Sequence, residues 1–184
     1  MADHRAKLVP DGIQDVLLTP EAIQGRVCDL GEQISHDYAP HSSPLLMIGL
    51  LNGSFVFLSD LCRAVTVPVE VDWMAVSSYR GGTESSGSVK IMKDVDTIIG
   101  NRQVLVIEGI VDTGLTLHYV LGVLRARKPA GLKVCTLLDK PARRMASVTI
   151  DYRGFELPDR FVVGYGLDLD QRYRELPYVA AIRK

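Results

Sequence analysis

Apolar residues along the chain follow two alternating patterns, one typical of buried strands and one typical of helices. Largely apolar runs of strand length occupy residues 44–51, 69–78, 102–108 and 132–139. Helical spacing predicts helices over residues 54–65 and 116–128, and the sequence TPE from Thr19 is the start signal of a further helix reaching about Tyr38. This alternation predicts a mainly parallel α/β sheet whose ligands bind at the carboxyl ends of the strands.

Composition excludes several classes of protein. The 184 residues, 47% of them apolar, suffice for a buried core, so we expect a single domain over residues 1–184. A net charge of -1 provides no basic field for nucleic acid or an anionic membrane. The longest apolar run, from Leu45, is too short to cross a bilayer, and the first residues hold no signal-peptide core, so we expect a cytoplasmic protein. The three cysteines are scattered in apolar stretches, which is typical of reduced thiols.

The stretch VLVIEGIVDTGLTL, residues 104–117, places acids and glycines between a strand and a helix. It nearly matches the nucleotide loop G-x-x-x-x-G-K-[ST], but Leu115 stands where that loop requires lysine. Glycines alone indicate only a turn. Glu108 and Asp112, combined with backbone amides at a helix N-terminus, suit instead a phosphorylated substrate that carries a divalent cation.

A second candidate segment, SSYRGGTESSGSVK at residues 77–90, is rich in Gly, Ser and Thr and has no apolar period. A surface loop without function is one interpretation. Loops of this length inside a compact domain are uncommon and tend to cover binding sites, so we favour a mobile lid.

Five ordered blocks carry a family resemblance: VLVIEGIVDTGLTL, LLNGSFVFLSDL, SSY, LLDKP and FVVGYGLDLDQRYRELPY. The first resembles the 5-phosphoribosyl 1-diphosphate (PRPP) binding motif of the type I phosphoribosyltransferases, and the resemblance covers nearly the whole chain. It implies the α/β fold of that family: a mainly parallel five-stranded sheet flanked by helices, with a small hood formed by the two ends of the chain.

The resemblance also implies the reaction and its residues. A purine salvage enzyme of this family transfers the 5-phosphoribosyl group of PRPP to a 6-oxopurine, hypoxanthine or guanine, with Mg²⁺ as cofactor and Asp112 as the base facing purine N7. The implied PRPP-binding residues are Leu51, Asn52, Gly53, Ser78, Tyr79, Glu108, Asp112, Thr113, Gly114, Leu115, Thr116 and Arg174. The implied purine-binding residues are Lys140, Phe161, Val162 and Asp168. Glu108 and Asp168 are the implied metal ligands, and the turn at residues 51–53 contains a non-proline cis peptide in relatives.

This sequence departs from the family at Gly109. Relatives carry two adjacent acids after the strand, whereas Glu108 is followed here by glycine. We therefore expect a weakened magnesium site, and we expect Gly109→Asp to raise the affinity for magnesium or PRPP, or the turnover.

Two alternatives from other functional classes remain. One is a PRPP-sensing regulator on the same fold, with or without RNA binding, although the retained acids and the near-neutral charge speak against it. The other is a phosphoribosyltransferase acting on xanthine or a pyrimidine. The resemblance implies a homodimer or homotetramer.

Overall fold

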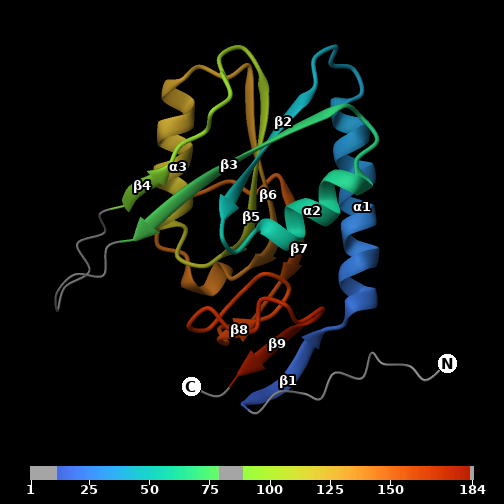
Figure 1. Ribbon diagram of the computed structural model, residues 1–184, viewed down its shortest axis with the longest axis vertical. Coiled ribbons are helices and arrows are strands. Elements are labelled where there is room, and N and C mark those ends of the chain that lie inside the picture. Colours follow the sequence, from blue (N-terminus) through green and yellow to red (C-terminus); the bar gives the residue numbers. More distant parts are fainter. Residues whose placement is uncertain (1–11, 79–88, 183–184) are drawn as a thin grey trace.

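The structure, a computed structural model, describes residues 12–78 and 89–182. Its main sheet has six strands in the order β4-β3-β2-β5-β6-β7 (Figure 1). Five of them run parallel: β3 (Val69–Ser78), β2 (Leu45–Leu51), β5 (Gln103–Val111), β6 (Gly131–Asp139) and β7 (Tyr152–Glu156). The expected five-stranded parallel core is present, and β4 (Val89–Lys93) adds a sixth strand, antiparallel to β3.

Helices cover both faces of this sheet. Helix α1 (Pro20–Tyr38) and helix α2 (Phe55–Ala64) pack on one face, and α3 (Leu115–Ala126) packs on the other (Figure 1). Successive residues of a strand point to opposite faces, so in β2 Met47 joins the core under α1 and α2 while Ile48 joins the core under α3. This two-sided burial explains why the strands read as continuous apolar runs.

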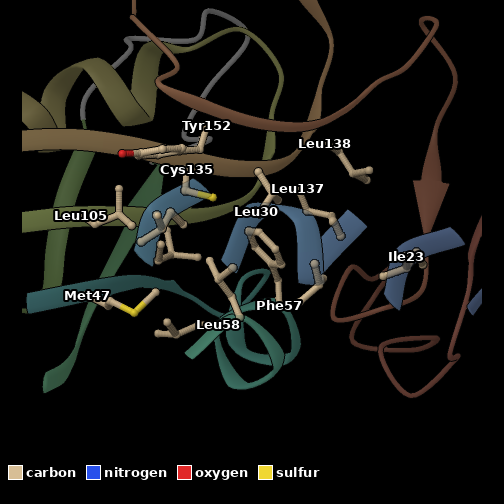
Figure 2. Packing of buried hydrophobic residues seen from close by; sticks show 14 of the residues in the cluster. Ile23, Leu30, Met47, Phe57, Leu58, Leu105, Cys135, Leu137, Leu138 and Tyr152 are labelled. Atoms are coloured by element: carbon tan, nitrogen blue, oxygen red, sulfur yellow. The ribbon is translucent and has the colours of Figure 1, made fainter. Parts of the chain in front are cut away.

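The core under α1 and α2 brings distant parts of the chain together. In Figure 2, Leu30 of α1 and Phe57 and Leu58 of α2 face Leu105 of β5 and Leu137 of β6. Among the described residues, Phe57 is the largest side chain with less than 2% exposure. These contacts pack α1 and α2 against one face of the sheet.

The predicted start of α1 is confirmed in detail. The Thr19 hydroxyl accepts a hydrogen bond from the Ala22 amide at 3.3 Å, and Pro20 is the first helical residue. A side-chain cap satisfies an amide that the first turn leaves without an intrahelical partner.

A second, three-stranded antiparallel sheet has the order β1-β9-β8. It pairs β1 (Ile13–Leu18) with β9 (Val179–Ile182), and β9 with β8 (Val162–Val163). In Figure 1 this sheet lies beyond the carboxyl ends of the parallel strands, as expected for a hood built from both ends of the chain. No helix in the described part of the chain is long and apolar enough to cross a membrane.

Candidate active site

The loop between β5 and α3 lines a hollow of about 170 Å³. The lining residues are Glu108, Ile110, Val111, Asp112, Thr113, Gly114, Thr116 and Leu117. Gly114 caps α3 in the left-handed conformation, with φ of 80°, which glycine adopts without strain. The hollow therefore lies at a helix N-terminus, where backbone amides favour an anion.

Strand β5 is longer than predicted, because it continues through Gly109 and Ile110 to Val111. Glu108 therefore lies within the strand, and only residues 112–114 form the turn. The Thr113 carbonyl accepts hydrogen bonds from the amides of Met145 at 2.8 Å and Ala146 at 3.1 Å. The segment after β6 thus ties down the turn.

A second hollow, of about 470 Å³, lies beside the first. It is lined by Ile110, Asp112, Lys140, Arg143, Phe161, Val162, Leu167 and Asp168. All four residues predicted for the purine pocket are among them. Ile110 and Asp112 line both hollows, so Asp112 stands at their boundary.

The carboxylate of Asp112 is partly buried. Its Oδ1 atom lies 3.1 Å from Arg143 Nε, close enough for an ion pair but without hydrogen-bond geometry, and no other described group donates a hydrogen bond to this buried oxygen. Arg144 Nη1 donates to the Asp112 backbone carbonyl at 3.2 Å. The backbone of Asp112 is held by Arg144, while Oδ1 keeps capacity to accept a proton or hydrogen bond.

Sequence reasoning missed the charged cluster behind this loop. Asp139, 1% exposed, forms ion pairs with Arg144 and, at 3.0 Å, with Arg153. A carboxylate buried this fully needs such partners. Asp139 lies within the block LLDKP, and the pair Arg143 and Arg144 that follows this block was the one available signal.

The residues predicted for the purine pocket are held by contacts to the rest of the fold. Lys140 is 4% exposed, its amide donates to the Val111 carbonyl at 2.9 Å, and its ammonium donates to the Arg160 carbonyl. Val162 pairs with Ala181 in the hood sheet. The larger hollow therefore lies between the end of β6 and the hood, and the buried Lys140 forms part of its wall.

Arg174 is an anchored side chain, only 18% exposed. Its guanidinium donates to the Gly166 carbonyl at 2.7 Å and lies 2.8 Å from Asp168 Oδ1. The other Asp168 oxygen accepts the Gln171 amide at 2.9 Å. Arg174 lines neither of the two hollows described above, but it is paired with Asp168, which lines the larger one.

The expected cis peptide is present between Leu51 and Asn52, at the end of β2. The carbonyl of the next residue, Gly53, approaches Gly109 so closely that a Cβ atom built on Gly109 would lie 2.5 Å from the Gly53 oxygen. The gain expected from Gly109→Asp therefore stays a prediction, and it requires the Gly53 carbonyl to shift. An aspartate cannot simply be added there, because its first carbon collides with backbone.

The implied metal ligands lie in separate hollows. Burial raises the pKa of Glu108 to about 7, although its Oε1 accepts the Gly109 amide at 2.9 Å. No three His, Cys, Asp or Glu side chains cluster as a metal cage within the described residues. Mg²⁺ at phosphate sites takes one or two carboxylates and completes its shell with water and substrate oxygens. Glu108 and Asp168 fit an ion of that kind.

Two predicted residues belong to the lid hypothesis. Ser78 is the last residue of β3, whereas Tyr79 and most of the segment 77–90 lie outside the described residues.

Comparison with known proteins agrees with this arrangement. Residues 15–170 match the phosphoribosyl transferase domain family. The hypoxanthine-guanine phosphoribosyltransferase of Mycobacterium tuberculosis is 50% identical over 181 residues, covering 96% of this chain and 90% of that protein. The hypoxanthine phosphoribosyltransferase of Salmonella typhimurium is 49% identical, covering 90% of this chain and 94% of that protein. A crystal structure of the Staphylococcus aureus hypoxanthine phosphoribosyltransferase has a TM-score of 0.88 at 46% identity, covering 94% of this chain and 92% of that one.

The chain belongs to the phosphoribosyltransferase family, and its mainly parallel sheet with a small antiparallel hood is the fold of that family. Within this family it groups with the hypoxanthine-guanine phosphoribosyltransferases, which are enzymes of purine salvage.

Proposed function

We propose that the chain joins hypoxanthine or guanine to the 5-phosphoribosyl group of PRPP, releasing pyrophosphate and forming a nucleoside monophosphate. The observation that carries this proposal is the position of Asp112, which lines both the small hollow at the helix N-terminus and the larger hollow beside it. A transferase of this kind must hold a phosphate and a base on two sides of one reacting carbon.

The 5-phosphate binds in the smaller hollow, on the amides and hydroxyls of residues 112–116. Support comes from its place at the start of α3 and from the hydrogen bonds that Met145 and Ala146 donate to Thr113. Amides fixed in this way stabilise an anion without reorganising. This explains why no lysine is needed at Leu115.

The base binds in the larger hollow. The Phe161 ring offers a stacking face, Val162 offers backbone groups to the base edge, and the Lys140 ammonium donates to the exocyclic oxygen that 6-oxopurines carry and adenine lacks. Asp112 accepts the proton that leaves the purine as its bond to the ribose carbon forms.

Pyrophosphate leaves toward the turn at Leu51, Asn52 and Gly53, with Arg174 as a further contact. The bond from the ribose carbon to the pyrophosphate oxygen breaks, and positive charge develops on the ribose. Magnesium, when bound, neutralises the charge of the departing pyrophosphate. Glu108, which lines the smaller hollow, and Asp168, which lines the larger one, are the carboxylates that would hold it.

We further propose that Ser78 and Tyr79 belong to a lid that excludes water, that the protein works in the cytoplasm, and that it assembles as a homodimer or homotetramer. The three cysteines are free thiols, as a reducing compartment requires. Light scattering on the purified protein measures the assembly directly.

The function is tested by incubating the protein with PRPP and Mg²⁺ and, in separate reactions, hypoxanthine, guanine, xanthine, adenine and uracil. We expect nucleotide and pyrophosphate in equal amounts with hypoxanthine or guanine, and none without magnesium. Binding of PRPP with no product from any base would favour the PRPP-sensing regulator instead.

A further inference from the structure

Arg143 lines the larger hollow, and neither the family motifs nor the proposed reaction gives this residue a role. Its Nε atom lies 3.1 Å from Oδ1 of Asp112, the buried oxygen of the carboxylate at the boundary of the two hollows. The side chains of Arg143 and Asp112 are 43% and 40% exposed, so they meet at the wall of the hollow and not in the core. A guanidinium group therefore stands beside the proposed general base.

The turn that carries Arg143 is tied to the backbone around Asp112. Arg143 ends a short 3-10 helix, and its amide donates to the Lys140 carbonyl at 3.1 Å. The Lys140 amide donates in turn to the Val111 carbonyl at 2.9 Å, and Arg144 Nη1 donates to the Asp112 carbonyl at 3.2 Å. Hydrogen bonds on both sides of Arg143 thus fix its backbone relative to the residue whose carboxylate it contacts.

Arg143 has a second carboxylate partner in Asp159, but the two contacts differ in burial. Arg143 Nη1 donates to Asp159 at 3.3 Å, and the Asp159 side chain is 57% exposed, so this pair contributes little. Oδ1 of Asp112 is buried and receives no hydrogen bond from the described residues. A buried carboxylate oxygen requires a compensating positive group. Arg143 supplies that group, and its exposed contact with Asp159 is secondary.

A contact at one oxygen orients the whole carboxylate. The two oxygens of Asp112 lie in one plane with their carbon atom, so a guanidinium against Oδ1 sets the direction of both. A general base must lie within about 2.6–3.2 Å of the atom whose proton it takes, and a misplacement of about 1 Å can lower a rate about 100-fold. We propose that Arg143 is a positioning residue that orients the Asp112 carboxylate toward the purine. This inference rests on the assignment of Asp112 as general base under Proposed function.

The test compares Arg143→Met with Arg127→Met. Methionine keeps much of the apolar stem of arginine and removes the guanidinium. Arg127 is the matched control, because it also pairs with an aspartate, Asp94, but lies at the end of α3 and lines neither hollow. Single-turnover rates are measured with PRPP, magnesium and saturating hypoxanthine, and PRPP dissociation constants by calorimetry.

We expect Arg143→Met to lower the single-turnover rate about 10- to 100-fold while the PRPP dissociation constant stays within about twofold of the parental value. Arg127→Met should change neither quantity. A parental rate in Arg143→Met would overturn the proposal. So would a faster rate, because it would mean that Arg143 obstructs Asp112.

A double variant tests whether Arg143 acts through Asp112. Arg143→Met is combined with Asp112→Asn, which already lacks the base. If Arg143 only orients this base, the added change lowers the rate of Asp112→Asn by less than about twofold, whereas independent effects would multiply. A further loss as large as the loss in the parent background would show another role for Arg143 and overturn the proposal.

Failure of the inference and failure of the proposed function give different results. If the parent forms no nucleotide from any base, or if Asp112→Asn keeps the parental rate, the assignment of function or base fails. If the parent is active and Asp112→Asn is slow while Arg143→Met is as fast as the parent, only the inference fails. Urea denaturation shows whether Arg143→Met is folded. If it is not, Arg143→Gln replaces it in each measurement, with the same expected results.

Discussion

Replacing Asp139 by asparagine removes the charge that pairs with two arginines near the loop between β5 and α3. Asp139 is 1% exposed, and it pairs with Arg144 and Arg153. The amide keeps the shape of the carboxylate but leaves both guanidinium groups without a counter-charge there. Because Arg144 also donates to the Asp112 carbonyl, we expect both the stability of the fold and the binding of PRPP to suffer.

The size of the effect follows from the exposure of the partners. Breaking a buried ion pair from one side costs about 3–5 kcal/mol. The side chains of Arg144 and Arg153 are 19% and 47% exposed, so water partly solvates their charge after the change. We expect the free energy of unfolding to fall by about 2–3 kcal/mol, which lowers the melting temperature by about 5–10 °C in a chain of this length.

Asp159→Asn is the matched control. Asp159 pairs with the neighbouring Arg143 at 3.3 Å, but its side chain is 57% exposed, and exposed pairs contribute about 0–1 kcal/mol. Urea denaturation gives the stability of both variants, and initial rates give the KM for PRPP, which we expect to rise about 10-fold in Asp139→Asn alone, equivalent to about 1.4 kcal/mol. Equal stability and equal KM in the two variants would refute the reasoning about the buried cluster.

Two further changes test other parts of the structure. Lys140→Ala should weaken binding of hypoxanthine and guanine about 10- to 150-fold, because a charged donor contributes about 1.5–3 kcal/mol, and calorimetry showing unchanged affinity for both bases would exclude that role. At Asp72, burial raises the pKa, but hydrogen bonds from the amides of Thr97, Trp73 and Asp96 outweigh it and lower the pKa from 3.8 to about 2. The lowered pKa gives about 2 kcal/mol of stability that is present above pH 4 and is lost as the pH falls through 2. Asp72→Asn should remove it at neutral pH, and an unfolding curve identical to that of the parent would contradict this.

The parts of the fold that depend on local sequence were predictable. The cap at Thr19 and the end of α1 at Tyr38 agree with the structure, because caps and helical periodicity are properties of neighbouring residues. Strands β4 and β7 escaped prediction. Strand β4 is short and only partly buried, and β7 carries Gly154 in its middle, where glycine lowers strand propensity.

In the candidate site, too, the features set by neighbouring residues were predictable and the contacts between distant segments were not. The loop from Asp112 to Thr116 was readable, because its residue types are adjacent in sequence and match a family motif. The ion pairs of Asp139 and the contact between Gly53 and Gly109 were not, since they join segments that only the folded sheet brings together. From the sequence, Gly109 looked like the loss of the family's second acid. In the structure it lies against the carbonyl oxygen of Gly53, just after the end of β2.

The central claim is that Asp112, at the boundary of the two hollows, takes the proton from the purine. It is tested most directly by rapid-quench measurement of a single turnover in Asp112→Asn, because this isolates the chemical step from product release. A positioned general base contributes about 10²–10⁴-fold, so the account predicts a single-turnover rate reduced by that factor, with PRPP affinity close to that of the parent. Asp159→Asn, which alters the other carboxylate paired with Arg143, should keep the parental rate. A near-parental rate in Asp112→Asn would contradict the account.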